Sequence, residues 1–235
     1  MTSPITRIAG MDWAGISTHL DIEGYAVLPG FLGEGAARDL ARLTETMSTG
    51  QRAQLVSDDM GSGELLYFGT SLPAPLENLR TKLYSHLAVI ANRWSEILGS
   101  GRRYPTEFDD FLEQNKRAGQ ARGQSHLNRL GAKDHVSLHQ RNEGEQVFPL
   151  QIVALLSEPG ADFSGGEFVM TEQRPRMQSR PMVLPLKLGD AAIITTSERP
   201  FKGAKGYYRV NLKHAISRVH RGQRIGMELT FHNAR

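Results

Sequence analysis

Cysteine is absent from the 235-residue chain, and long hydrophobic runs are missing as well. The lack of cysteine excludes disulfide-stabilised scaffolds, Cys-ligated zinc, iron–sulfur clusters and a cysteine nucleophile. No stretch approaches the roughly 18 apolar residues of a membrane-spanning helix. The first residues show no basic start followed by an apolar run, so we expect no secretory signal and a cytoplasmic protein. Any chemistry must come from histidine, carboxylates, arginine, lysine and hydroxyl groups.

A large excess of charge of one sign is also missing. The chain has 28 Lys and Arg against 25 Asp and Glu, a formal net charge of +3. So small an excess predicts neither a nucleic-acid-binding nor a polybasic membrane-binding surface. We therefore expect a small-molecule substrate, anionic or amino-acid-like, and neither nucleic acid nor membrane as a partner. The sequence leaves a homodimer open.

The length predicts a single domain spanning residues 1–235. Its two halves differ in sequence pattern. Residues 1–119 are expected to be mainly helical support, with one early extended segment at Gly24–Leu32. Apolar residues recurring at three- and four-residue steps indicate amphipathic helices. These helices are expected at Gly33–Met47, Leu76–Ile97 and Thr106–Ala118.

Residues 120–235 are expected to form a β-rich core that carries the site. Short apolar or alternating runs are separated there by turn clusters rich in glycine and proline, which is typical of an antiparallel sandwich or barrel. The expected strands are Val136–Gln140, Val147–Ser157, Glu167–Thr171, Met182–Leu188, Ala191–Thr196, Tyr207–Val219 and Arg224–His232.

Among the eight histidines, His139 and His214 lie in two such strands, and Arg224 opens the last one. Two histidines from distant strands, with a carboxylate, form one face of many non-haem iron sites. A nearby arginine can bind a dicarboxylate cosubstrate through two charge-assisted hydrogen bonds. Spacing alone leaves open that both histidines are ordinary core or surface residues. His220 and His232 are expected at the surface or at an edge.

Longer stretches carry a family resemblance. They are Leu138–Gln140, Val147–Gln151, Leu155–Gly160, Asp162–Phe168, Thr171–Arg180, Gly206–His214 and Phe231-His232. Through them the chain resembles bacterial 2-oxoglutarate/Fe(II)-dependent oxygenases of the prolyl-hydroxylase-like type.

The resemblance implies an α+β, mainly β fold: a double-stranded β-helix, or jelly roll, with a supporting N-terminal helical layer. It also implies Fe(II) and 2-oxoglutarate as cofactors. His139 and His214 would be metal ligands, and Arg224 would bind the far carboxylate of 2-oxoglutarate.

The sequence departs from this family at the third metal ligand. Where the family has His-x-Asp, this chain reads His139-Gln140-Arg141, and a guanidinium cannot ligate a divalent cation. Further along, Glu143 replaces a usual aromatic residue, and His135 stands where the family tends to have tyrosine.

The last expected strand carries Glu228, where the family has small apolar residues. Because side chains alternate at period two, an inward Arg224 places Glu228 inward as well. An inward glutamate needs a partner, and Arg141 is the obvious candidate.

Three interpretations follow. Glu228 or Glu143 supplies the missing carboxylate while Arg141 turns aside. Alternatively, the two histidines alone hold iron, and the vacated position takes water, halide or substrate. In the third, Arg141 takes the place of the metal and pairs with Glu228.

The predicted function is an oxygenase-like enzyme that hydroxylates or similarly oxidises a small-molecule or amino-acid-like substrate at an atypical metal site. Arg141 and Glu228 are its predicted catalytic residues. The alternative is a metal-free descendant, either a ligand-binding protein or a non-oxidative enzyme.

Overall fold

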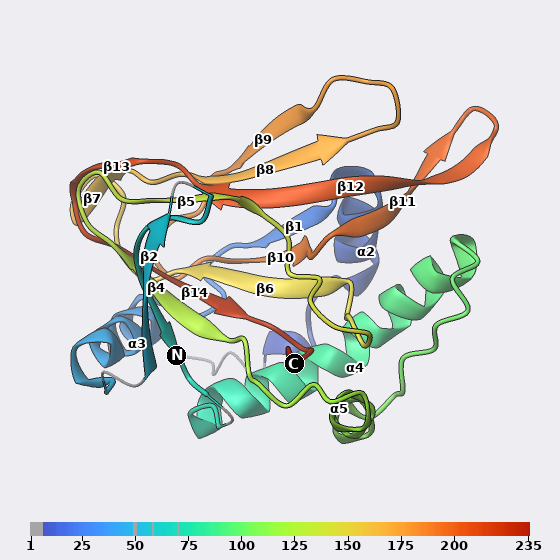
Figure 1. Cartoon of the computed structure of the whole chain (residues 1–235), viewed down its shortest axis with the longest axis horizontal. Coiled ribbons are helices and arrows are strands. Elements are labelled where there is room, and N and C mark those ends of the chain that lie inside the picture. The colour runs from blue at the N-terminus through green and yellow to red at the C-terminus, as the bar shows by residue number, and fades with distance from the viewer. Residues whose placement is uncertain (1–6, 49–50, 58, 70) are drawn as a thin grey trace.

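The computed structural model describes residues 7–48, 51–57, 59–69 and 71–235, with elements labelled as in Figure 1. Its helices are α2 (Trp13–Glu23), α3 (Glu34–Thr46), α4 (Ala74–Ile97) and α5 (Phe108–Arg117). Its first strands are β1 (Tyr25–Leu28), β2 (Arg52–Ser57), β3 (Gly61–Tyr67), β4 (His126–Leu130) and β5 (His135–His139). The middle strands are β6 (Leu150–Leu155), β7 (Phe163–Gly165), β8 (Phe168–Gln173), β9 (Arg180–Leu184) and β10 (Ala191–Thr195). The last are β11 (Glu198–Gly203), β12 (Gly206–Ile216), β13 (Val219–Gly222) and β14 (Arg224–Leu229).

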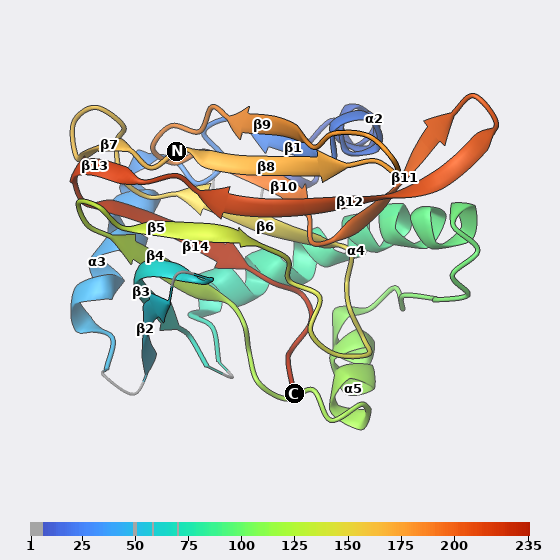
Figure 2. The same ribbon diagram turned by 45° about the horizontal axis from the view of Figure 1, so that its top comes forward.

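The strands form a nearly closed antiparallel barrel of the jelly-roll type. The main sheet runs β1-β10-β6-β14-β4-β3-β5-β12-β8-β9, with β2 paired to β3 and β11 paired to β12. In Figure 1 the helices α3, α4 and α5 lie below β6, β14 and β4, whereas β8, β9 and β12 lie above them. Figure 2 shows the β11–β12 hairpin extending past the other strands. The predicted mainly β fold with supporting helices is confirmed.

Two apolar cores hold these layers together. The first lies between the helices and the outer faces of the strands, where the expected stripe of α4 buries Leu83, Leu87 and Trp94. The second fills the inside of the barrel with residues such as Val153, Leu155 and Leu212. Inward-facing side chains of the strands therefore share one enclosed interior, which is where the site residues also lie.

The N-terminal half differs from the prediction in one respect. Residues 1–119 are not only a helical support, because β1, β2 and β3 all belong to the main sheet. Strand β3 pairs with both β4 and β5. The β2–β3 hairpin therefore helps to close the barrel beside the site. In the part of the chain that the structure describes, no helix is both long and apolar enough to cross a membrane.

Candidate metal and cosubstrate site

Strand pairing brings together side chains that are far apart in the sequence. His139 ends β5 directly opposite His214 on β12, and the centroids of the two imidazole rings are 4.2 Å apart. Glu228 on β14 stands opposite His126 on β4. These strands belong to one run of the barrel, β14-β4-β3-β5-β12, and all four side chains point into the same interior.

Three of these residues form a group able to hold a metal ion. One ligand atom each from His139, His214 and Glu228 lies within 4.8 Å of the other two. Two imidazoles and one carboxylate are the donor set of many non-haem iron sites. Glu143, by contrast, is exposed and pairs with Arg122 at 3.3 Å, so it takes no part in this group.

The protonation states of the histidines suit metal binding. The Nδ1 atom of His139 lies 2.9 Å from the Ser137 carbonyl oxygen and must donate to it, because a carbonyl only accepts. This leaves His139 Nε2 with a free lone pair, which is buried and has no hydrogen-bond partner among the described residues. Burial, together with the proximity of His214, lowers the pKa of His139 to about 3. His139 is therefore a neutral imidazole held in a fixed tautomer, the form in which a histidine can bind a metal ion.

His214 is oriented by an amide. The Gln151 side-chain amide lies 3.2 Å from His214 Nε2. Among the described residues, Gln151 Oε1 and His214 Nδ1 have no hydrogen-bond partner. The Phe168 ring stacks against His214 at 5.8 Å between centroids. The sequence analysis did not single out Gln151, although it ends one of the stretches that carry the family resemblance.

Arg141 lies in the same interior, with only 12% of its side chain exposed. Its Nε donates to Glu228 Oε2 at 3.3 Å, and its Nη2 donates to His126 Nε2 at 3.5 Å. Burial alone would raise the pKa of Glu228, but the charge of Arg141 holds that pKa well below its ordinary value. Glu228 is therefore an ionised carboxylate inside the barrel, and its charge is balanced by Arg141.

His126 completes this polar network, although no pattern in the sequence pointed to it. Its Nδ1 donates to the Gln124 carbonyl at 2.9 Å, so its Nε2 is an acceptor. Burial lowers the pKa of His126 to about 4, although the charge of Glu228 opposes this. It is a neutral acceptor for Arg141.

Arg224 lies four residues before Glu228 on β14, a separation of about 13 Å along a strand. Its Nε donates to the Gly166 carbonyl and its Nη1 to Asn128 Oδ1, both at 2.8 Å. Burial lowers its pKa to about 10, although the charge of Glu228 opposes this. Arg224 also borders a cavity of about 320 Å³, lined mostly by apolar residues such as Leu155 and Phe168. A cation at this depth suits the carboxylate of a bound ligand.

The prediction for His232 was wrong. This residue is fully buried rather than at the surface, and its Nδ1 accepts a hydrogen bond from the Phe148 backbone at 3.3 Å. Burial, with the charge of Arg141 nearby, lowers its pKa to about 4. His220 is exposed as expected. His135 is half-buried on β5 and lies outside the metal-binding group.

The fold places this chain among proteins built like the 2-oxoglutarate/Fe(II) oxygenases. A prolyl-4-hydroxylase from Pseudomonas putida superposes with a TM-score of 0.56 over 95% of this chain and 99% of that protein, at 11% identity. A 2OG-Fe(II) oxygenase family protein from Burkholderia pseudomallei gives a TM-score of 0.51 over 95% and 93%, at 16% identity. These likenesses establish the fold.

Sequence comparison then identifies the family. Residues 63–234 match the model of the Oxygenase-NA family, which is described as an oxygenase catalysing oxidative methylation of damaged DNA. An uncharacterized protein of Mycobacterium tuberculosis is 39% identical over 167 residues, which span 71% of this chain and 72% of the relative. The chain belongs to the Oxygenase-NA family, and the resemblance found in the sequence is confirmed.

Proposed function

We propose that this protein is an Fe(II)- and 2-oxoglutarate-dependent oxygenase whose metal ligands are His139, His214 and Glu228. The observation that supports this most strongly is the meeting of these three donors, from three strands, within 4.8 Å. Glu228 on β14 supplies the carboxylate that the residue two positions after the first histidine provides elsewhere in the superfamily. Arg224 would then bind the far carboxylate of 2-oxoglutarate.

The residues present fit such a metal. The buried Nε2 of His139 has no partner in the part of the chain that the structure describes, and the carboxylate of Glu228 is ionised because its pKa is held low. Fe(II), 2-oxoglutarate and dioxygen together supply the oxidising power for C–H hydroxylation. The protein contributes orientation: Ser137 fixes the His139 ring, Gln151 fixes His214, and Asn128 holds Arg224 in place.

Arg141 gives this site its unusual character. It donates to Glu228 Oε2, the carboxylate oxygen that also lies 3.8 Å from His214 Nε2. A guanidinium beside a divalent cation is repelled by it, so metal binding requires Arg141 to turn away from Glu228. Once turned, its charge is available to an anionic substrate. We therefore propose a small anionic or amino-acid-like substrate, whereas the family description names damaged DNA.

A metal-free function is the second candidate, and the Arg141–Glu228 ion pair favours it. Both side chains are nearly closed off from water, with 12% and 3% exposed. A satisfied pair of this kind can persist in place of a metal. The interior would then bind an anionic ligand or perform a non-oxidative reaction.

Metal titration separates the two candidates. Under anaerobic conditions we expect about one equivalent of Co(II), with a visible d–d spectrum, in the wild-type protein and in His220→Ala, which changes an exposed histidine. His139→Ala and Glu228→Gln should bind at least tenfold more weakly. Adding 2-oxoglutarate to the Fe(II) form should produce a charge-transfer band. If neither metal nor band is found, the oxygenase proposal fails and the metal-free candidate stands.

A further inference from the structure

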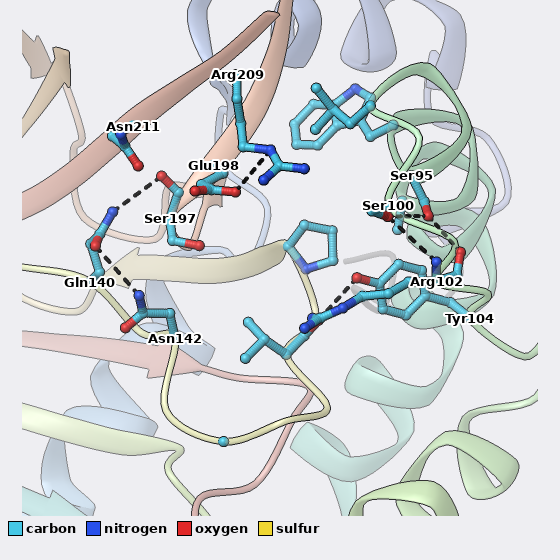
Figure 3. Close-up of a pocket in the computed structure, with 16 residues that line it drawn as sticks. Ser95, Ser100, Arg102, Tyr104, Gln140, Asn142, Ser197, Glu198, Arg209 and Asn211 are labelled. Carbon is cyan, nitrogen blue, oxygen red and sulfur yellow. Dashed lines mark hydrogen bonds and ion pairs between the residues drawn. The ribbon is translucent and has the colours of Figure 1, made fainter. Parts of the chain in front are cut away.

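A second cavity, of about 470 Å³, lies outside the barrel interior. Its walls come from the end of α4, the segment after it, the β5–β6 connection and the base of the β11–β12 hairpin. Figure 3 shows Tyr104 and Arg102 on one side, facing Glu198, Arg209 and Asn211 on the other. Its volume falls in the range of ordinary small-molecule sites, and none of the residues assigned to the metal or to 2-oxoglutarate lines it.

The charged groups of this cavity favour an anion. Arg209 Nε lies 3.3 Å from Glu198 Oε2, and both side chains are about half exposed. Among the described residues, no carboxylate forms an ion pair with Arg102 on the opposite wall. Two cations and one carboxylate leave a net charge of +1 in the lining. An anionic group can therefore bind Arg102 without displacing an existing ion pair.

The remaining lining is mixed. Trp94 and Tyr104 border the cavity but belong to the core, with 2% and 9% of each residue exposed, so only a small part of each ring faces a ligand. The Trp94 Nε1 donates to Asp21, and the Tyr104 hydroxyl donates to the Val147 carbonyl at 3.0 Å. Together with Pro149, these ring edges provide an apolar contact, while Asn142 and Asn211 add hydrogen-bonding groups.

We propose that this cavity is a second ligand site, which takes a small organic anion: a carboxylate or phosphate attached to a flat ring. Arg102 and Arg209 would bind the anionic group, and Pro149 with the bordering edges of Trp94 and Tyr104 would contact the ring. The proposal does not rest on the metal site, because the two sites share no side chain.

The two sites do share a backbone segment. His139 and Arg141 point into the barrel, whereas Gln140 and Asn142 line the cavity. Gln140 ties this segment to the far wall by donating to the carbonyls of Ser197 and Leu212 at 3.2 and 2.8 Å. A ligand that contacts Asn142 therefore restrains the segment that positions His139 and Arg141.

Tryptophan fluorescence tests the proposal, because the chain has only two tryptophans and Trp94 lines the cavity. In a Trp13→Phe background, four probes are titrated: adenosine 5′-monophosphate, benzoate, inorganic phosphate and adenosine. We expect saturable changes with the first two, and binding of adenosine and phosphate weaker by roughly tenfold or more.

Variants that change the charge of the cavity should change its affinity for an anion in opposite directions. Arg102→Ala and Arg209→Ala should each weaken binding of the monophosphate roughly tenfold, whereas Glu198→Gln should strengthen it. Arg117→Ala, on the exposed face of α5, is the matched control and should change nothing. Hydrogen exchange of residues 139–147 should slow when the monophosphate is bound. The proposal is overturned if no anion binds saturably up to roughly 10 mM, or if adenosine binds as tightly as its monophosphate. It is also overturned if Arg102→Ala behaves like the control.

Discussion

Arg141 Nε lies 3.3 Å from Glu228 Oε2, and both side chains are enclosed by the barrel. Glu228 lies on β14, whereas Arg141 lies in the connection after β5, 87 positions away in the sequence. Each would be costly to bury alone, because an unpaired charge loses its hydration without compensation. Together they form a neutral unit beside His139 and His214, the proposed metal ligands.

Removing one partner should therefore cost far more than removing both. We expect Arg141→Ala to lower the free energy of unfolding by about 3–5 kcal/mol, since Glu228 is left as an uncompensated charge. The double variant Arg141→Met/Glu228→Leu should recover most of this loss. Urea unfolding of the wild type, both single variants and the double variant measures the coupling. Strictly additive effects would show that the pair does not act as a unit.

Restoring a carboxylate at position 141 should strengthen metal binding. In Arg141→Asp, the guanidinium that repels a metal ion is replaced by a carboxylate that can bind one. The imidazoles of His139 and His214 remain in place. We expect at least a tenfold gain in Co(II) affinity, equivalent to about 1.4 kcal/mol or more. Arg122→Asp, a charge reversal at an exposed arginine, serves as the control. If Arg141→Asp binds no metal at all, the assignment of His139 and His214 as ligands is wrong.

Acid should destabilise the protein well above the range in which carboxylates titrate. The pKa values of His126, His139 and His232 are lowered to about 4, 3 and 4, mainly because all three are buried. In the unfolded chain they titrate near 6.5, so below that pH the unfolded state binds more protons than the folded state. Stability is present above pH 6.5 and falls as the pH drops toward 4, by up to about 1.4 kcal/mol per pH unit for each histidine.

Urea midpoints measured between pH 7.5 and pH 4.5 test this dependence. His232→Gln, which keeps an acceptor for the Phe148 backbone, should reduce the slope by about one third. His220→Gln, at an exposed position on β13, should leave the slope unchanged. A stability that is flat between pH 7 and 5 would contradict the assignment of three buried neutral histidines.

Arg199 should be among the most sensitive positions outside the site. It is fully buried and forms an ion pair with Glu172. It also donates to the carbonyls of Asp21 and Ile22, at 2.6 and 2.8 Å, at the end of α2. Arg199→Ala should lower the free energy of unfolding by about 3–5 kcal/mol, because Glu172 and the helix end lose their donor together. Thermal unfolding beside Arg117→Ala, which should change stability by less than about 0.5 kcal/mol, checks this.

Local pattern predicted the elements that bury a continuous apolar face. The α4 stripe through Leu83 and Leu87, and the runs that became β6 and β10, were recognisable because their own side chains form the cores. The β2–β3 hairpin was missed because Arg52–Tyr67 has no strong alternation and is held mainly by pairing with β4 and β5. Helix α2 was missed for a similar reason, since only Ile16 and Leu20 are buried along it.

Site residues could be predicted only where they lie in a strand with alternating side chains or in a motif of the family resemblance. Side chains alternate between the two faces of the last strand, which predicted that Arg224 and Glu228 both point inward. Both residues are buried. His126 and Gln151 could not be assigned, because their proximity to Arg141 and His214 depends on which strands are neighbours. His232 was misplaced because the chain after β14 turns beneath Phe148, a tertiary contact that carries no local signal.

Gly226 lies between Arg224 and Glu228 on the inner face of β14. A Cβ atom there would come within 2.7 Å of Arg224 Nη1 and 2.8 Å of Asn128 Oδ1. Any side chain at this position would separate the arginine from its amide partner and intrude between the two buried charges. The polar interior of this barrel thus depends on the absence of a single methyl group, because the arginine and the amide crowd the place where it would lie, and even alanine at position 226 would disturb their hydrogen bond.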